Sequence, residues 1–174
     1  MLEFGSGSST GFLLKELAKQ APRSSLVSYD HSAAWAYQGM SPNLDLRLRP
    51  LTQWSTSNFD AMFRTGFDLS SSNQVSDAAA TNMRLRNSFY MIEPDEIPPN
   101  VGLVVLDGPN GNGRSAAFPL LKPVLHTGAL IFIDDLTSYD FESRLGMLYN
   151  YETVSKLTDS AIHPTFSFGL FRII

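Results

Sequence analysis

The chain has no cysteine, no long hydrophobic run and little positive charge, and each of these absences excludes a class of protein. Without cysteine there is no disulfide framework, no thiolate zinc site and no cysteine nucleophile. No apolar run approaches the roughly 18–20 residues that cross a bilayer as a helix. The N-terminus also lacks a basic region followed by an apolar stretch, which is the pattern of a signal peptide. We therefore predict a cytoplasmic protein that has no membrane partner.

The overall charge is slightly negative. The sequence has 13 Lys and Arg against 17 Asp and Glu, which gives a formal net charge of −4 at pH 7. This balance disfavours a general nucleic-acid partner. With 43% hydrophobic residues, the 174-residue chain is long enough to form one domain with its own core. Composition leaves the oligomeric state open, a homo-oligomer included.

Strand and helix signals alternate in the first and last parts of the chain. Apolar or alternating segments predict strands at residues 2–4, 26–29, 44–48, 103–106, 129–133, 152–157 and 166–174. Apolar residues at helical spacing predict helices at residues 12–18, 32–38, 114–125 and 141–149. This order predicts the α/β class, with a Rossmann-like, doubly wound, mostly parallel seven-stranded sheet. We expect helices on both faces of this sheet and an antiparallel last strand.

The segment from residue 52 to residue 99 shows little periodic pattern. We interpret it as an irregular insertion with a short helix near residues 78–85, inside a single domain that spans residues 1–174. The region from Arg47 to Arg86 holds five of the nine arginines, with Asp and Glu interspersed among them. This mixture favours a solvated, charge-balanced surface over an anion-binding face.

A loop rich in glycine and serine, residues 5–11, lies between a predicted strand and a predicted helix. Glycine lets the backbone approach a ligand closely, and the free N–H groups at a helix start favour an anion or carboxylate. Asp30 ends the next strand, where an acid can bind both hydroxyls of a ribose. The arrangement predicts an adenosine-type cofactor. Thr10 stands where the dinucleotide fingerprint has glycine, which argues against NAD.

These residues resemble a known family. The run Glu3-Phe4-Gly5-Ser6-Gly7-Ser8-Ser9-Thr10 resembles the first motif of class I S-adenosylmethionine-dependent methyltransferases. Asp107-Gly108-Pro109 followed by Arg114, and then Ile133-Asp134-Asp135, are similar to later parts of the same superfamily. The resemblance extends to its metal-assisted sugar and small-molecule O-methyltransferases, and it implies S-adenosylmethionine as the cofactor.

The resemblance also implies which residues bind this cofactor. They would be Glu3, Gly5, Ser6, Gly7, Ser8, Ser9, Asp30 and His31. The two glycines would line the methionine part of the cofactor, and the serines at the helix start would contact its carboxylate. Glu3 would organise the loop, Asp30 would bind the ribose and His31 would flank the adenine.

Three acidic residues follow two predicted neighbouring strands. Asp107 ends one strand, and Asp134 and Asp135 end the next, so all three are expected at the same edge of the sheet. Carboxylates this close raise each other's pKa unless a cation intervenes. Mg²⁺ or another divalent cation prefers carboxylate oxygens, and it would also lower the pKa of a substrate hydroxyl. The pattern therefore predicts a metal site formed by Asp107, Asp134 and Asp135.

The same acidic residues would have other roles if no metal is bound. Asp107 would then be the general base, or would only fix the Asp-Gly turn, and Asp135 would only cap the next helix. Arg114 would pair with Asp107, reach an anionic substrate, or face solvent. We take Asp107 and Arg114 as the predicted catalytic residues.

The predicted activity is methyl transfer from S-adenosylmethionine to a hydroxyl of a small-molecule or saccharide acceptor. Oxygen is favoured over nitrogen or carbon only through the argument for a metal. Two alternatives remain open. One is an NAD-dependent oxidoreductase on a similar sheet, although the chain has no clear Tyr-x-x-x-Lys pair. The other is a non-catalytic cofactor-binding relic or fragment.

The start of the chain bears on the last alternative. Class I methyltransferases usually have helices before the first strand that help to cover the cofactor, whereas this chain begins within the predicted strand at residue 2. We therefore expect these N-terminal lid helices to be absent. The cover would then come from the insertion at residues 52–99 or from a longer chain.

Overall fold

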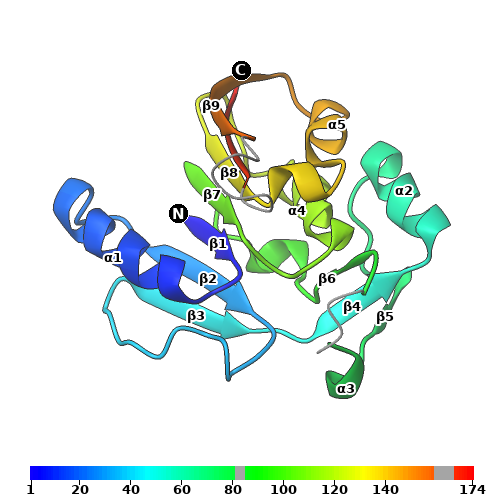
Figure 1. Ribbon diagram of the computed structural model, residues 1–174, viewed down its shortest axis with the longest axis horizontal. Coiled ribbons are helices and arrows are strands. Elements are labelled where there is room, and N and C mark those ends of the chain that lie inside the picture. The colour runs from blue at the N-terminus through cyan, green and yellow to red at the C-terminus, as the bar shows by residue number, and fades with distance from the viewer. Residues whose placement is uncertain (81–84, 159–166) are drawn as a thin grey trace.

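The molecule is built around a seven-stranded sheet with the strand order β3-β2-β1-β7-β8-β10-β9 (Figure 1). The structure, a computed structural model, describes residues 1–80, 85–158 and 167–174. The strands of the large sheet are β1 (Leu2–Phe4), β2 (Leu26–Asp30), β3 (Leu44–Leu48), β7 (Leu103–Leu106), β8 (Leu130–Asp134), β9 (Tyr151–Leu157) and β10 (Phe168–Ile173). The first five of these pair in parallel, and β10 runs antiparallel to both β8 and β9. The predicted fold class is confirmed.

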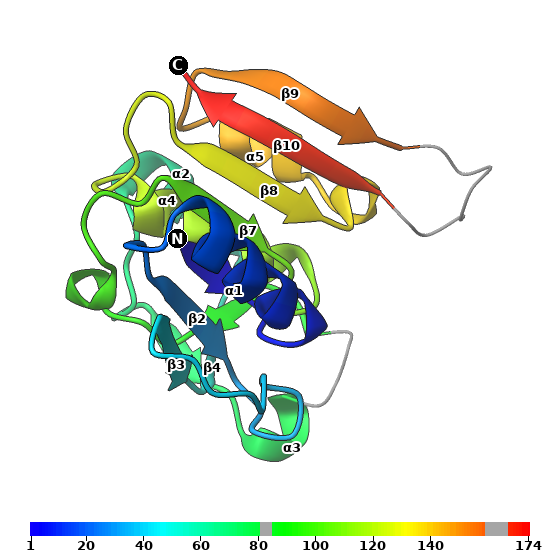
Figure 2. The same cartoon turned by 90° about the vertical axis from the view of Figure 1, so that its left-hand side faces the viewer.

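Helices cover both faces of this sheet. Figure 2 shows α1 (Ser8–Gln20) in front of the strands, and α4 (Ala117–Leu121) and α5 (Phe141–Gly146) behind them. The helix predicted at residues 114–125 is shorter than expected and begins as a 3-10 turn, η2 (Asn112–Ala116). Pro123 has no N–H to donate, which explains why the helical bonding does not continue past Leu121. Within the described residues, no helix is long and apolar enough to cross a membrane.

The short helix predicted at residues 32–38 does not form, and the segment is a series of turns. The N–H groups of Trp35 and Ala36 both donate to the carbonyl of Ser32, which closes a single turn. The next donor is diverted, because the N–H of Tyr37 bonds to the Ser6 hydroxyl at 2.9 Å instead of continuing the helix. Trp35, in this turn, is 77% exposed.

We predicted an irregular insertion from residue 52 to residue 99. The structure instead shows a second, smaller sheet and two helices in this region. Strands β5 (Ser72–Gln74), β4 (Leu51–Trp54) and β6 (Ser88–Tyr90) form an antiparallel sheet in that order. The other elements are α2 (Thr56–Thr65), α3 (Asp77–Ala80), η1 (Pro94–Glu96) and, further along the chain, η3 (Leu136–Ser138). The predicted helix at 78–85 overlaps α3, and its residues 81–84 lie outside the described part of the chain. Strands of three or four residues are too short to show a clear period in the sequence.

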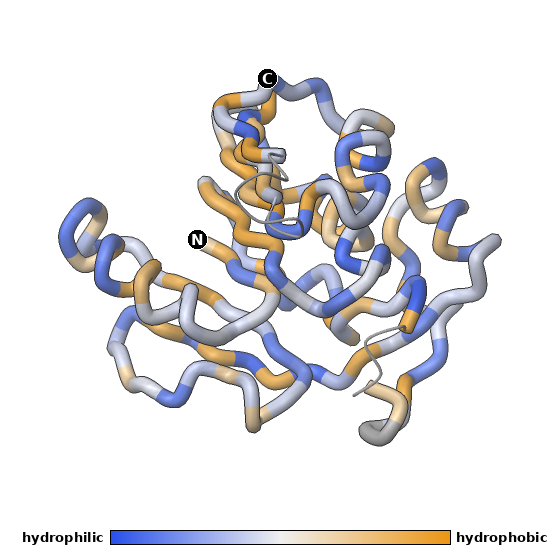
Figure 3. The backbone as a smooth tube through the Cα atoms, in the orientation of Figure 1, coloured by the Kyte–Doolittle hydropathy of each residue, from blue (hydrophilic) through white to orange (hydrophobic). Residues whose placement is uncertain are grey.

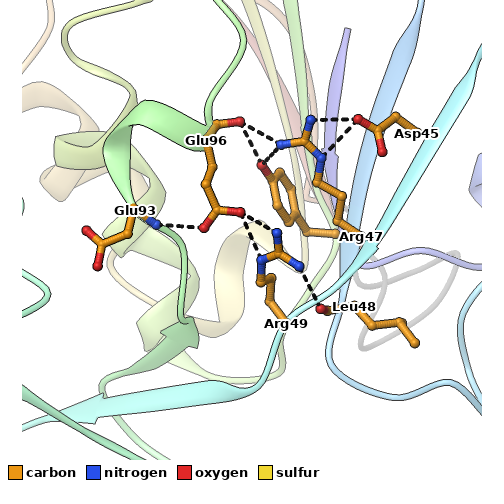
Figure 4. Close-up of polar contacts among 7 residues, drawn as sticks. Asp45, Arg47, Leu48, Arg49, Glu93 and Glu96 are labelled. Carbon is orange, nitrogen blue, oxygen red and sulfur yellow. Dashed lines mark hydrogen bonds and ion pairs between the residues drawn. The ribbon is translucent and has the colours of Figure 1, made fainter.

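Ion pairs and hydrogen bonds connect β2 and β3 with η1 (Figure 4). Arg47 donates to the carbonyl of Glu96 at 2.7 Å, to the Tyr29 hydroxyl at 3.0 Å and to the Asp45 carboxylate at 2.6 Å. Arg49 pairs with the carboxylate of Glu96. Two of the five arginines are thus used within the fold, and their pairing with acids agrees with the expected charge-balanced surface.

Hydrophobic residues concentrate in the central strands (Figure 3). An aromatic group under β1 joins the two sheets: the ring of Phe4 lies 5.6 Å from Tyr29, 5.0 Å from Phe89 and 6.1 Å from Tyr90, measured between centroids. All four side chains are buried. This packing holds β6 of the small sheet against β1 and β2 of the main sheet.

A test of this docking is the substitution Gly113→Ala in η2. A Cβ added at Gly113 would lie 1.9 Å from the carbonyl oxygen of Ser88 in β6, so the two segments would have to separate. We expect a loss of about 1–3 kcal/mol in the free energy of unfolding, as for other overpacked sites. Thermal unfolding should show a Tm lower by roughly 2–4 °C for each kcal/mol. Gly102→Ala is the matched control, since a Cβ there has no atom within 4 Å; equal Tm values for the two variants would contradict the docking.

Candidate active site

The candidate site lies where the strand order reverses. From β1 the chain continues outward to β2 and β3 and then returns to β7 and β8 on the other side of β1. The helices that follow β1 and β7 leave on opposite faces of the sheet (Figure 2). In doubly wound sheets the crevice between two such loops, beyond the carboxyl ends of the strands, is the ligand site.

The loops after β1 and β7 are in direct backbone contact in this crevice. The N–H groups of Asp107 and Gly108 both donate to the carbonyl of Phe4, at 2.8 and 2.7 Å. Gly5 has a φ of +96°, and a Cβ added to it would lie 2.5 Å from the nitrogen of Gly108. Glycine is therefore required at Gly5 both for its backbone conformation and for the close approach.

Glu3 is fully buried at the base of the loop. Its Oε2 accepts hydrogen bonds from Ser28 at 2.6 Å and Thr10 at 2.7 Å, and its Oε1 accepts one from Ser9 at 2.9 Å. Burial raises the pKa of Glu3, and these three hydroxyl donors partly offset the increase. The side chain predicted to organise the loop thus connects β1, β2 and the first turn of α1.

The remaining loop residues are held by a second set of hydrogen bonds. The Ser6 hydroxyl accepts from the N–H of Tyr37 and lies 3.3 Å from the Thr10 hydroxyl. The N–H of Gly7 donates to Thr10 Oγ1 at 2.9 Å. Ser8, the first residue of α1, is exposed at the helix start. Of the predicted cofactor-contacting serines, Ser8 is the one whose side chain faces solvent.

Asp30 and His31 lie at the carboxyl end of β2. Asp30 is 4% exposed, and its Oδ1 accepts a hydrogen bond from the N–H of Ser32 at 2.9 Å. His31 Nδ1 is 3.5 Å from the same carboxylate oxygen, and this buried nitrogen has no hydrogen-bond partner within the described residues. The His31 ring lies 6.3 Å from that of Tyr90. The structure therefore brings both predicted residues to the crevice.

Asp107 and Asp134 also reach this edge, from the ends of the neighbouring strands β7 and β8. Burial raises the pKa of Asp107 from 3.8 to about 6, and the charge of Asp134 adds to the increase, whereas Arg114 opposes it. A carboxyl group with this pKa is ionised in most molecules at neutral pH and still has appreciable affinity for a proton.

Asp135 pairs with Arg114 and contributes only a smaller increase to the pKa of Asp107. It has a left-handed backbone with φ +55°, and its Oδ2 lies 3.5 Å from Nη2 of Arg114. No group of three His, Cys, Asp or Glu side chains is positioned to hold a metal ion anywhere in the described ranges 1–80, 85–158 and 167–174. The predicted three-acid metal site of Asp107, Asp134 and Asp135 is therefore not formed, because the turn at Asp135 directs its carboxylate to a guanidinium.

Arg114 is 1% exposed and bridges the loops after β7 and β8. Its Nε donates to the carbonyl of Pro109 at 3.1 Å, and its Nη1 donates to the carbonyl of Asp134 at 2.9 Å. The guanidinium also lies 5.8 Å from the ring centroid of Phe141. These contacts hold the two loops together and leave the side chain little freedom to reach a substrate.

Tyr90, in β6, lies between the two halves of the crevice. Its side chain is buried, and a Cβ added to Gly108 would come within 2.6 Å of its hydroxyl. Burial raises the pKa of Tyr90 well above 10, and the charges of Asp30 and Asp107 raise it further. The phenol is therefore neutral. Its position in a segment without periodic pattern explains why the sequence did not single it out.

Comparison with known proteins decides among the candidate activities. The profile of a methyltransferase domain family matches residues 2–136, from β1 to the loop after β8. The chain belongs to this methyltransferase family. The predicted class I S-adenosylmethionine-dependent methyltransferase is thereby confirmed, and S-adenosylmethionine is the cofactor expected for it.

The fold of the methyltransferase is also found in a solved structure. It resembles a proposed O-methyltransferase from Klebsiella pneumoniae with a TM-score of 0.54 and 12% sequence identity. The match covers 99% of this chain and 71% of that one. At this identity the likeness shows the fold alone. No curated protein matches the chain in sequence.

The raised pKa of Asp107 predicts how the stability of the methyltransferase depends on pH. Its folded-state pKa of about 6 lies above the unfolded value, so the folded state binds more protons between about pH 4 and 6. The associated stability is present below the unfolded pKa and is lost as pH rises through 6. We expect about 1–2 kcal/mol of loss, allowing for partial solvent screening.

Urea unfolding of the wild type and of Asp107→Asn at pH 4.5 and 7.5 measures this difference. The variant should lack the loss, because an amide does not titrate in this range. Asp95→Asn, which removes an exposed carboxylate in η1, should retain it. The same pH dependence in wild type and Asp107→Asn would show that Asp107 is not the titrating group.

Proposed function

We propose that this methyltransferase transfers the methyl group of S-adenosylmethionine to a hydroxyl of a small-molecule or saccharide acceptor. The observation that carries the proposal is the pair Asp107 and Asp134 at the ends of β7 and β8, beside the Gly5 loop. The pKa of about 6 at Asp107 suits a general base that removes a hydroxyl proton near neutral pH.

The residues of the crevice fit the cofactor. Asp30 presents a buried carboxylate whose Oδ1 accepts a hydrogen bond from the N–H of Ser32. No hydrogen bond to Oδ2 is formed within the described residues, which leaves Oδ2 for the ribose hydroxyls. His31 Nδ1, buried without a partner in the described chain, supports a contact at the adenine side. A Cβ built on Gly7 would meet its nearest atom only at 3.9 Å, which leaves room beside the helix start of α1.

In this proposal Gly5, Ser6, Gly7, Ser8 and Ser9 hold the methionine part of the cofactor. The free N–H groups of the first turn of the 13-residue helix α1 attract its carboxylate. Glu3 keeps the loop in place from below, through its three hydroxyl donors.

When bound, S-adenosylmethionine supplies a methyl group on a positively charged sulfur. The protein positions the acceptor and activates its oxygen. Asp107 would accept the proton of the acceptor hydroxyl as the methyl group moves from sulfur to that oxygen, with S-adenosylhomocysteine as the leaving group. Burial and the charge of Asp134 raise the affinity of Asp107 for that proton. Arg114 keeps both acid-bearing loops in register, so its proposed role is in positioning and not in contact with the acceptor.

In a second version of the mechanism, a divalent cation would bind between Asp107 and Asp134. Two carboxylates can bind Mg²⁺ together with waters. However, the buried guanidinium of Arg114 already lowers the pKa of Asp107 and engages Asp135, which would be the third ligand. We therefore favour the version in which Asp107 is a general base that needs no metal.

Cofactor binding is tested by isothermal titration with S-adenosylmethionine and S-adenosylhomocysteine. The wild type should bind both, and Asp30→Asn should weaken binding by roughly 10- to 100-fold, since a hydrogen bond to a charged group contributes about 1.5–3 kcal/mol. Asp95→Asn should bind like the wild type. Absence of binding of either compound to the wild type at millimolar concentration would refute the proposed function.

The role of Asp107 is tested by turnover with hydroxylated acceptors. Asp107→Asn should lower kcat by about 10²–10⁴-fold and leave the Kd for S-adenosylhomocysteine nearly unchanged. In the wild type, kcat should rise with pH through about 6, because the base must be ionised. A chelator should not reduce activity. Loss of activity with chelator and its return with Mg²⁺ would support the metal version instead.

A further inference from the structure

A large cavity lies beside α2, outside the residues that the sequence identified. Its volume is about 680 Å³, within the range of roughly 300–1,000 Å³ that is usual for small-molecule sites. It is lined by Thr56, Asp60, Leu85, Arg86, Asn87, Gly111, Asn112, Ser115, Ser138, Tyr139, Asp140 and Arg144. We call it the α2 cavity.

Three parts of the chain form its walls. One is α2 with the end of the segment before β6, another is the loop after β7, and the third is the segment between β8 and α5. The second and third walls continue directly from Asp107 and Asp134, the two strand-end acids. Figure 1 shows α2 beside the α4 and α5 side of the main sheet. The α2 cavity is thus built from the same two loops as the proposed general base.

The floor of the α2 cavity is already ordered by amide hydrogen bonds. Asn112 Oδ1 accepts from the N–H of Asn87 at 2.9 Å, and Asn112 Nδ2 donates to Asn87 Oδ1 at 2.7 Å. Asn87 Nδ2 then lies 3.3 Å from the Thr56 hydroxyl, and Ser115 donates to the carbonyl of Asn112. A ligand would meet these groups without having to order them, which favours binding.

One wall carries an ion pair held on aromatic rings. Arg144 Nη2 donates to Asp60 at 2.9 Å, and its guanidinium lies 5.0 Å from the ring of Phe59 and 4.7 Å from that of Phe63. The rings fix the plane of the guanidinium, and the pair joins α2 to α5. Arg144 can still donate from its other nitrogen atoms to a ligand.

Three further lining side chains supply hydrogen-bonding groups to the cavity. The side chains of Arg86 and Asp140 and the hydroxyl of Tyr139 have no hydrogen-bond or ion-pair partner among the residues that the structure describes. Arg86 provides donors, Asp140 provides acceptors, and the phenol provides both. The Tyr139 ring, 36% exposed, offers an apolar face beside them.

The charges of the lining residues balance. Arg86 and Arg144 are offset by Asp60 and Asp140, so the cavity has no excess of either sign. A phosphorylated or otherwise strongly anionic acceptor would need more positive charge than this. Among the lining residues, Leu85 and Tyr139 are the large side chains with apolar surface, and the others are polar, charged or glycine. Paired donors and acceptors in a neutral, polar site match a compound that carries many hydroxyls and no charge.

We propose that the α2 cavity binds the methyl acceptor and that this acceptor is a neutral polyhydroxylated compound, a saccharide. The inference rests on the proposed methyl transfer and adds to it both the location of the acceptor and its chemical class. The inserted segment that carries α2 then determines acceptor specificity, while the loops after β7 and β8 orient the reacting hydroxyl.

Amide chemical shifts test the location and the class together. Maltotriose, cellotriose and xylotriose are titrated at millimolar concentration into ¹⁵N-labelled full-length protein, first alone and then with S-adenosylhomocysteine. Catechol and glucose 6-phosphate serve as comparison compounds. We expect at least one saccharide to shift the amides of Asn87, Asn112 and Arg144. No shift at these amides with any saccharide, or shifts only with catechol or glucose 6-phosphate, would overturn the proposal.

Variants then locate the contact. Asp140→Asn and Arg86→Gln should each weaken saccharide binding by roughly 10-fold or more, because each removes charge-assisted hydrogen bonds. The Kd for S-adenosylhomocysteine should stay the same. Arg64→Gln is the matched control, since Arg64 is an exposed arginine of α2 that does not line the cavity. Unchanged saccharide binding in both cavity variants would overturn the assignment of the site.

The two proposals fail in different ways. If S-adenosylhomocysteine does not bind at all, the proposed methyl transfer fails whatever the saccharides do. If it binds and the saccharides leave the cavity amides unchanged, only the acceptor inference fails. The titration without S-adenosylhomocysteine keeps the two results separate.

Discussion

The backbone contact between Gly5 and Gly108 is the constraint on which the rest of the site depends. The carbonyl of Phe4 accepts two N–H groups from the loop after β7, and the absence of side chains on both glycines lets the loops touch. Because β1 and β7 are neighbours at the reversal of strand order, this contact places the cofactor loop and Asp107 on one edge of the sheet. A side chain at either glycine would push apart the two halves of the crevice.

Glu3 gives this contact a rigid support. A buried carboxylate is costly unless it is well hydrogen-bonded, and here two hydroxyls from α1 and one from β2 meet that requirement. The arrangement makes the position of the loop depend on Ser28 in β2 as well as on α1. Binding geometry in the crevice is thus tied to the core of the sheet and not to the loop sequence alone.

Features that depend on a local sequence pattern could be predicted from the sequence. Features that depend on contacts between distant residues could not. The apolar runs of β7 and β8 and the glycine loop before α1 each have a signal within a few residues, so the seven-stranded fold and its carboxyl edge were predictable. The short strands β4, β5 and β6 have too few residues for such a signal. The α2 cavity joins Asp60 to Arg144, 84 residues apart, and no local pattern encodes that pairing. Residues 32–38 do not form the predicted helix, because the N–H of Tyr37 donates to the hydroxyl of Ser6, which is distant in the sequence.

In the described residues the three acids predicted to hold a metal are not grouped together, for a reason that also bears on the chemistry. Position in the sequence suggested that three acids act together, but Asp135, which has a left-handed backbone, pairs with Arg114. That guanidinium is buried, bonds to carbonyls of both loops and is close enough to lower the pKa of Asp107. A fixed positive charge therefore already occupies the side of the acid pair where a third metal ligand was expected. With burial and the charge of Asp134 raising the pKa of Asp107 to about 6 and Arg114 limiting that rise, Asp107 can exchange a proton near neutral pH, which is the property that its proposed role as a general base requires.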